Sequence, residues 1–282
     1  MIIDFHTHVL PPEIKQDRSR YVESDIAFAA LYADEKARIA TADDLIDNMD
    51  REGIGVSVIV NYSWSTRELC TGTNDYILES VARFPGRLAG FCAVPSAFTD
   101  DSLAEIERCA RAGATGVGEL RPDAMLPRFT DGDAMRPFVD ILMKHKLVLL
   151  LHSSEPVGHY YPGKGNATPD VLYSFIANFP DLPVVCAHWG GGLPFYTLMP
   201  EVREALENVY YDTAASPFLY RPEIYEHVSR CVGAERVLFG SDYPLMPPSR
   251  LLREIDSLSL HEDTRRMILA ENAGRLLGIR TG

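Results

Sequence analysis

The sequence lacks an excess of positive charge. Lys and Arg total 27 against 40 Asp and Glu, which gives a formal net charge of −13, and no run of basic residues offsets this balance. Attraction to nucleic acid or to an anionic membrane surface depends on clustered Lys and Arg side chains. The composition therefore argues against both classes of partner.

The sequence also lacks a cysteine framework and a long apolar run. Its five cysteines are odd in number and widely spaced, and they form no C-x-x-C motif. No apolar segment approaches the roughly 20 residues that span a membrane, and the N-terminus has no basic stretch followed by an apolar run. We therefore expect a cytoplasmic protein in a reducing setting, with no membrane partner.

The sequence does contain a regular alternation of short apolar runs and amphipathic stretches. Hydrophobic residues make up 46% of the 282 residues, which is ample for a large core. We predict strands at residues 2–6, 56–62, 88–94, 116–120, 147–152, 184–188, 209–212 and 237–242. We predict helices at residues 42–51, 74–84, 101–112, 133–145, 169–178, 194–206, 222–232, 248–256 and 261–277.

This alternation predicts the fold class. The strands are mostly apolar on both faces, which is typical of parallel strands covered by helices. Eight strands that each precede a helix predict a (β/α)₈ TIM barrel, with residues 1–282 forming a single domain. A doubly wound open sheet is the competing architecture, but no G-x-G-x-x-G motif follows the first strand. Residues 11–39 form the longest uncertain connection, an insertion or a lid over the site.

His6 and His8 form a His-x-His pair at the first predicted strand. Because side chains alternate across a strand, the two imidazoles point to the same face, close enough to hold one metal ion. The pair by itself is equally consistent with two buried, hydrogen-bonded histidines.

Other residues of the metal-ligand type stand at the ends of further predicted strands. Strands four, five, six and eight end at or near Glu119, His152, His188 and Asp242. In a barrel, the carboxyl ends of all strands open onto one mouth, where active sites lie. Each residue alone has a structural alternative, such as an ion pair with Arg121 or a helix cap. Together they predict a divalent metal site, with zinc as the first choice and manganese or iron next.

Several motifs resemble the amidohydrolase superfamily, specifically its amidohydrolase-2 group, which also holds decarboxylases and hydratases. The matching pieces are I-D-F-H-T-H at 3–8, L-H at 151–152, A-H-W-G-G at 187–191, L-F-G-S-D-Y-P at 238–244 and E-N-A-G-R-L-L-G at 271–278. The motifs run from the first strand to the last helix, so the resemblance covers nearly the whole chain. The resemblance agrees with the barrel and the metal site, and it leaves the substrate open.

The resemblance also implies roles for the ligand-type residues. In mononuclear members of the superfamily, residues in the positions of His6, His8, His152 and Asp242 hold one metal ion, and the equivalent of His188 serves as an acid–base or orienting residue. In TatD-like relatives, a glutamate in the position of Glu119 bridges two metal ions. The sequence leaves one and two metal ions open.

A bound divalent ion lowers the pKa of its water towards roughly 7, so we expect a metal-activated water with Asp242 as the proton carrier. The leading hypothesis is a metal-dependent hydrolase of an amide, lactone or ester bond in a small substrate, with or without a carboxylate. The alternative is a metal-dependent non-oxidative decarboxylase, a lyase, of an aromatic or related acid. Glu119 favours hydrolysis, because a bridging hydroxide is a hydrolytic device. A third, non-enzymatic role finds little support, since metal ligands at an open mouth stabilise a core poorly.

Substrate contacts are predicted from the loops that follow the strands. The loop at 153–165 contains His159, Tyr161 and Lys164, and it lies at the predicted barrel mouth. Arg121 could bind a substrate carboxylate through its planar guanidinium, with a structural salt bridge as the even alternative. The expected partner is thus a small molecule. A homodimer is a further option that the sequence leaves open.

Overall fold

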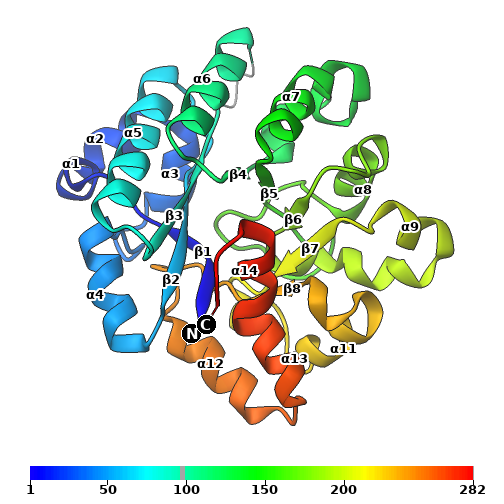
Figure 1. The fold of residues 1–282 in the computed structure, drawn as a ribbon. Coiled ribbons are helices and arrows are strands. Elements are labelled where there is room, and N and C mark those ends of the chain that lie inside the picture. Colours follow the sequence, from blue (N-terminus) through cyan, green and yellow to red (C-terminus); the bar gives the residue numbers. More distant parts are fainter. Residues whose placement is uncertain (96–98, 282) are drawn as a thin grey trace.

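Eight parallel strands form one sheet in chain order in the computed structural model, which describes residues 1–95 and 99–281 (Figure 1). The strands are β1 (Ile3–His8), β2 (Val56–Val60), β3 (Leu88–Cys92), β4 (Gly116–Leu120), β5 (Val148–Leu151), β6 (Val184–Cys186), β7 (Val209–Asp212) and β8 (Val237–Leu238). Each strand pairs in parallel with the next.

Helices surround this sheet on the outside (Figure 1). They are α1 (Pro12–Gln16), α2 (Arg18–Ser24), α3 (Ile26–Tyr32), α4 (Ala42–Glu52), α5 (Arg67–Arg83), α6 (Asp100–Arg111), α7 (Gly132–His145), α8 (Pro169–Asn178), α9 (Pro200–Ala205), α10 (Ser216–Leu219), α11 (Ile224–Val232), α12 (Pro248–Ser257), α13 (Glu262–Arg266) and α14 (Asn272–Leu277). A π-helical turn (Met267–Glu271) joins the last two.

β1 and the segment that follows β8 close the sheet into a barrel through main-chain hydrogen bonds. The amide of Phe5 donates to the carbonyl of Phe239 (2.7 Å), that of Asp242 to His6 (2.9 Å), and that of His8 to Tyr243 (2.6 Å). The predicted TIM barrel is therefore confirmed.

The interior of the barrel is a packed apolar core. Phe5, Val58, Phe91, Leu150 and their neighbours from the other strands form one buried cluster. A Cβ atom at Gly116 would lie 2.5 Å from Cζ of Phe91, so only glycine leaves room on β4 for that ring. Helices pack their apolar faces on the outside of the strands, in two larger buried clusters. The packing inside the barrel and between helices and strands fixes the positions of the strand ends.

Two predicted helices differ from the structure. The predicted helix 74–84 begins earlier, at Arg67, where the Oγ1 of Thr66 accepts the amide of Leu69 (3.3 Å). Thr73, which directly precedes the predicted start, lies inside the helix with its hydroxyl donating to the carbonyl of Leu69 (2.8 Å). The predicted helix 194–206 is α-helical only as α9. Residues 194–198 form a 3₁₀ helix instead, and Met199, which precedes Pro200, takes an extended conformation between the two.

Residues 11–39, expected as an insertion or a lid, form the three short helices α1 to α3 and pack against the barrel mouth. The side chain of Asp25 caps α3 by accepting the amide of Phe28 (2.9 Å), and it also accepts the amide of Ser65 (2.7 Å). The ring of Phe28 stacks on Trp64, with 5.3 Å between centroids. The segment is thus a packed helical wall at the mouth.

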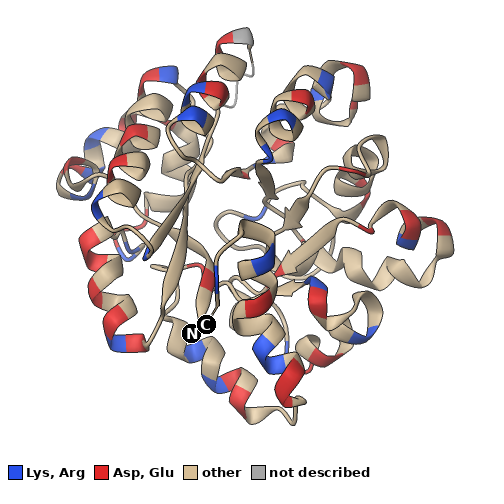
Figure 2. Cartoon of the chain, in the orientation of Figure 1, with Lys and Arg blue, Asp and Glu red and all other residues tan. Residues whose placement is uncertain are grey.

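Charged residues lie mainly on the outer helices, and the central strands carry few of them (Figure 2). None of the helices in the described ranges is long and apolar enough to cross a membrane.

Asp4 and Ser241 fasten the junction between β1 and the segment after β8. The carboxylate of Asp4 accepts the amide of Ser241 (2.8 Å), the hydroxyl of Ser241 (2.6 Å) and the amide of His6 (3.3 Å). Burial raises the pKa of Asp4 to about 7, and the hydrogen bonds from Ser241 counteract part of that rise. Two candidate ligands, His6 and Asp242, are direct neighbours of this junction.

We expect Ser241→Ala to lower the free energy of unfolding of the metal-free protein by roughly 1.5–3 kcal/mol, because a donor to a buried carboxylate is lost. The loss should be larger at about pH 8 than at about pH 5, since Asp4 needs that donor most when it is ionised. Urea unfolding at both pH values measures the change. Ser174→Ala, whose hydroxyl donates to the carbonyl of Asp170 on an exposed helix, is the control and should stay within about 0.5 kcal/mol. Equal effects of the two substitutions would contradict the role given to Ser241.

Candidate metal centre

Six side chains converge at the carboxyl ends of the strands. β1 supplies His6 and His8, and β4 supplies Glu119. His152 directly follows β5, His188 lies two residues after β6, and Asp242 lies in the segment after β8. None of the six is more than 9% exposed. The structure thus brings together every metal ligand that the sequence predicts.

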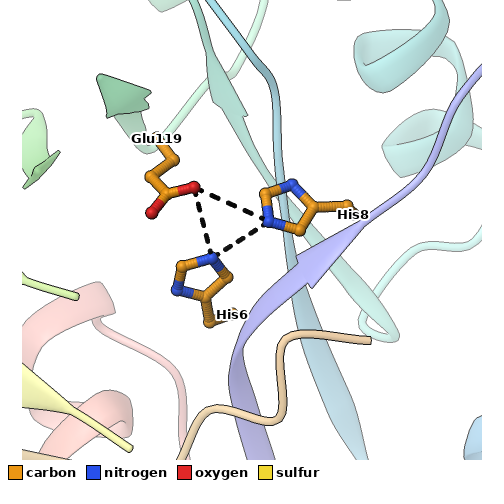
Figure 3. A group of neighbouring side chains, drawn as sticks. All are labelled: His6, His8 and Glu119. Carbon is orange, nitrogen blue, oxygen red and sulfur yellow. Dashed lines mark hydrogen bonds and ion pairs between the residues drawn. The ribbon is translucent and has the colours of Figure 1, made fainter. Parts of the chain in front are cut away.

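The two histidines of β1 face Glu119 (Figure 3). The Nε2 atoms of His6 and His8 lie 3.1 Å apart, and each lies 3.7 Å from Oε2 of Glu119. Oδ1 of Asp242 lies 3.2 Å from the Nε2 atom of His8 and 3.8 Å from that of His6. Three nitrogen and oxygen donors around one point are a suitable site for a divalent ion.

Glu119 also belongs to a second group of donors. Its Oε1 atom lies 2.8 Å from Nδ1 of His152 and 3.3 Å from Nε2 of His188. These three residues again offer ligand atoms within 4.8 Å of one another. Because one carboxylate serves both groups, the geometry accommodates either one metal ion or two ions bridged by Glu119.

Asp212 orients two of the histidines, and the sequence reasoning missed it. Its Oδ2 atom lies 2.8 Å from Nδ1 of His6, and its Oδ1 atom accepts the amide of His188 (2.9 Å). With Nδ1 of His6 directed at Asp212, its Nε2 atom faces Glu119 and is the nitrogen available to a metal ion once its proton is displaced. Asp212 ends the predicted seventh strand, so reading that strand end as well as the others would have found it.

His188 is oriented by its own turn. Its Nδ1 atom lies 3.0 Å from the carbonyl of Ala214, which leaves Nε2 directed at Glu119. The backbone from His188 to Gly192 has positive φ angles, a conformation that favours glycine. At Gly191 a Cβ atom would come within 2.4 Å of the carbonyl oxygen of Ser154. The A-H-W-G-G motif therefore makes the tight turn that carries His188.

The charges of these groups depend strongly on one another. Burial opposes ionisation of Glu119, but His152 and His6 hold its pKa well below the usual range. Burial opposes protonation of His6, but Asp212 and Glu119 raise its pKa well above the usual value. Burial likewise opposes ionisation of Asp242, while the hydrogen bond from His8 lowers its pKa to about 2. The buried carboxylates thus require nearby positive charge, which a divalent cation would also supply.

A cavity of about 660 Å³ opens above the metal centre. Glu119, His152, His188 and Asp242 form part of its lining, and the wall opposite includes residues of α3. Much of the lining is apolar or aromatic, including Phe28, Tyr32, Tyr62, Trp64, Phe218 and Leu245. A mostly apolar cavity with a few polar groups at one end is the usual form of a small-molecule site.

Arg121 lines this cavity and is also part of a salt bridge. Its Nη2 atom lies 3.1 Å from Oδ2 of Asp123, and the amide of Asn166 donates to the same oxygen (3.1 Å). Asp123 therefore ties Arg121 to the loop after β5, as the salt-bridge alternative expects. The contact between Arg121 and a substrate carboxylate stays a prediction. Arg121 thus lines the cavity while Nε and Nη2 of its guanidinium donate to Asp123 (3.4 and 3.1 Å).

Of the other three residues predicted to contact substrate, two line the cavity. His159 and Tyr161 line the cavity, and the hydroxyl of Tyr161 donates to Glu155 (2.8 Å). Lys164 instead donates from Nζ to the carbonyls of Val157 (2.6 Å) and His159 (3.1 Å). Within the described part of the chain, Lys164 is not among the residues that line the cavity, so its contact with substrate remains a prediction.

The chain is similar to known decarboxylases. It is 26% identical over 306 aligned residues to 6-methylsalicylic acid decarboxylase of Penicillium expansum, covering 94% of this chain and 93% of that protein. Among solved structures, 5-carboxyvanillate decarboxylase of Novosphingobium aromaticivorans, complexed with manganese and 4-hydroxy-3-methoxy-5-nitrobenzoic acid, is 19% identical. It matches with a TM-score of 0.80 over 99% of this chain and 96% of the other.

A dihydroxybenzoic acid decarboxylase from Polaromonas sp., solved with manganese and 2-nitroresorcinol, gives a TM-score of 0.75 at 19% identity. It covers 100% of this chain and 98% of its own. At such identities the structural likeness shows a shared fold.

The prediction of a hydrolase is wrong in the light of these relatives, which are named as decarboxylases of aromatic acids. The physical reason is that imidazole and carboxylate ligands determine which ion binds, whereas the reaction depends on the groups around the substrate. The presence of Glu119 is therefore not evidence for hydrolysis. A carboxylate shared by two groups of donors can hold ions without any bridging hydroxide.

The family assignment rests on the sequence as a whole. The family model described as amidohydrolase matches residues 3–279, which includes every strand of the barrel and all six converging side chains. The chain belongs to the amidohydrolase family.

Proposed function

We propose that this protein is a metal-dependent non-oxidative decarboxylase of a hydroxylated aromatic carboxylic acid. The single observation that carries the proposal is the similarity to 6-methylsalicylic acid decarboxylase over 94% of the chain. The shape of the site is consistent with it. An aromatic-walled cavity above a buried metal centre suits a flat ring with polar substituents at one end.

The residues proposed to hold the metal are His6, His8 and Asp242, with Glu119 and His152 completing the site and His188 next to them. A bound divalent ion would act as a Lewis acid on oxygen atoms of the aromatic acid. Manganese is the ion in the solved relatives named above, and zinc also suits the donor set.

Asp242 is proposed to carry the proton. It lines the cavity and is ionised, because the hydrogen bond from His8 outweighs its burial and lowers its pKa. Its carboxylate can accept the proton of a ring hydroxyl and return it to the ring carbon that bears the carboxylate. The bond between that carbon and the carboxylate then breaks, carbon dioxide leaves, and the electron pair restores the aromatic ring as a phenolate. Solvent finally protonates the phenolate.

Arg121 is proposed to bind an anionic group of the acid. Arg121 lines the cavity, and the salt bridge with Asp123 limits its motion. A planar guanidinium pairs well with a carboxylate. His159 and Tyr161 on the neighbouring wall are proposed as further substrate contacts.

The function is tested with purified protein stripped of metal and then loaded with Mn²⁺ or Zn²⁺. We expect release of carbon dioxide from hydroxylated benzoic acids, such as 6-methylsalicylic acid, only after metal is added, because the stripped site lacks the Lewis acid. Coupled detection of bicarbonate, together with chromatography of the phenol product, measures the reaction. Amides and lactones serve as controls, and hydrolysis of these without any carbon dioxide release from the acids would overturn the proposal.

The role of Asp242 is tested by Asp242→Asn. We expect kcat to fall at least 100-fold, since an amide cannot carry the proton, while the folded structure is kept. Circular dichroism checks the fold, and Mn²⁺ binding is measured in parallel because Asp242 is also a proposed ligand. Asp256→Asn is the matched control on exposed α12, where Asp256 pairs with Arg265. Near-normal turnover by the Asp242 variant would remove the proton role from this residue.

The role of Arg121 is tested by Arg121→Gln. We expect KM for the acid to rise roughly tenfold with a smaller change in kcat, because the interaction binds the ground state and the transition state alike. Steady-state kinetics measures both constants. Arg221→Gln, which removes an exposed guanidinium paired with Glu223, should leave both constants unchanged. An unchanged KM for Arg121→Gln would mean that Arg121 does not bind the substrate and serves only in the salt bridge with Asp123.

A further inference from the structure

His8 differs from its neighbours in how its ring is held. In His6 and His188 the nitrogen that faces away from Glu119 has a partner, Asp212 in one case and the carbonyl of Ala214 in the other. The corresponding Nδ1 atom of His8 is buried and has no hydrogen-bond partner among the described residues. A metal-binding histidine ordinarily donates this second N–H to an acceptor, which fixes the orientation of the ring.

The contacts of the other nitrogen cannot replace that support. Nε2 of His8 lies near His6, Glu119 and Asp242, and all of these contacts are on the side where the metal binds. A metal ion bound between these atoms would replace the direct contacts. The orientation of the His8 ring must therefore be fixed by a contact outside the metal-binding side.

The ring of Tyr62 lies flat against His8. The two ring centroids are 4.5 Å apart and the planes differ by only 8°, a stacked arrangement. Tyr62 follows β2, the strand that pairs with β1. The hydroxyl of Tyr62 is in turn hydrogen-bonded to that of Tyr32 at the end of α3, so the stacked ring is itself held at its far end.

We propose that Tyr62 is the positioning residue of the metal ligand His8, and that its aromatic face takes the place of the missing hydrogen-bond acceptor. The face restricts rotation of the imidazole, so that Nε2 is directed at the metal before an ion arrives. Tyr32 supports the same ring from the N-terminal helical wall. The inference rests on the metal centre of the proposed function and adds a residue outside the ligand set.

The test compares three variants by their affinity for Mn²⁺. Tyr62→Leu removes the aromatic face, Tyr62→Phe keeps the face and removes the hydroxyl, and Tyr32→Phe removes the same hydrogen bond from the other side. Each protein is stripped of metal and titrated with Mn²⁺, and the free ion is measured by electron paramagnetic resonance. Phe218→Leu, which removes a cavity-lining aromatic ring that packs beneath Arg250, is the matched control.

We expect Tyr62→Leu to weaken Mn²⁺ binding roughly 10-fold or more, the size of effect seen when the support of a metal ligand is lost. Tyr62→Phe, Tyr32→Phe and the control should remain within about twofold of the wild type, because the face is kept. Urea midpoints of the metal-free proteins separate positioning from general destabilisation. Tyr62→Met is the second non-aromatic variant in case the Leu variant does not fold.

Two results would overturn the inference while leaving the metal centre intact. One is Mn²⁺ binding by a folded Tyr62→Leu or Tyr62→Met protein at wild-type affinity. The other is an equal loss in Tyr62→Phe, since the hydroxyl and not the face would then be responsible. A wild-type protein that binds neither Mn²⁺ nor Zn²⁺ would instead overturn the proposed metal centre, and the inference with it.

Discussion

The closure of the barrel between β1 and the segment after β8 is the constraint on which the site depends. The amide of Asp242 donates to the carbonyl of His6, so two proposed ligands from opposite ends of the chain are neighbours through the main chain. Asp4 fixes the same junction by accepting both the amide and the hydroxyl of Ser241. The metal centre is thus built by the same hydrogen bonds that close the fold.

Burial imposes the second constraint. Glu119, Asp212 and Asp242 are nearly inaccessible to solvent, and a buried carboxylate without a partner would cost several kcal/mol. Each of them faces imidazole groups at between 2.8 and 3.8 Å. The histidines therefore serve the stability of the protein as well as its chemistry, because they compensate the carboxylates that orient them. A cation at the centre strengthens this compensation, which couples metal binding to folding.

Much of this could be predicted from the sequence, and the omissions have physical reasons. The alternation of apolar runs and helical stretches predicted the barrel, because burial on both faces of a parallel strand leaves a clear pattern. The strand ends predicted the six converging residues. Asp212 was missed because it was not considered as support for a ligand. The reaction was predicted wrongly because ligand-type residues such as His6, His8 and Asp242 indicate that an ion binds and do not indicate the reaction. The aromatic residues that line the cavity come from segments far apart in the sequence, so no local motif reveals them.

The aromatic wall of the cavity also links the substrate cavity to the metal. Tyr32 and Phe28 of α3 line the cavity and stack on each other, with 4.6 Å between ring centroids. The ring of Tyr32 also packs edge-on against that of Tyr62, with 5.8 Å between centroids. A substitution in α3 that reshapes the cavity for a different ring would therefore also act on the stacked pair of Tyr62 and His8. Because one aromatic array serves both tasks, changes of specificity in this wall are constrained by the need to keep a metal ligand in place.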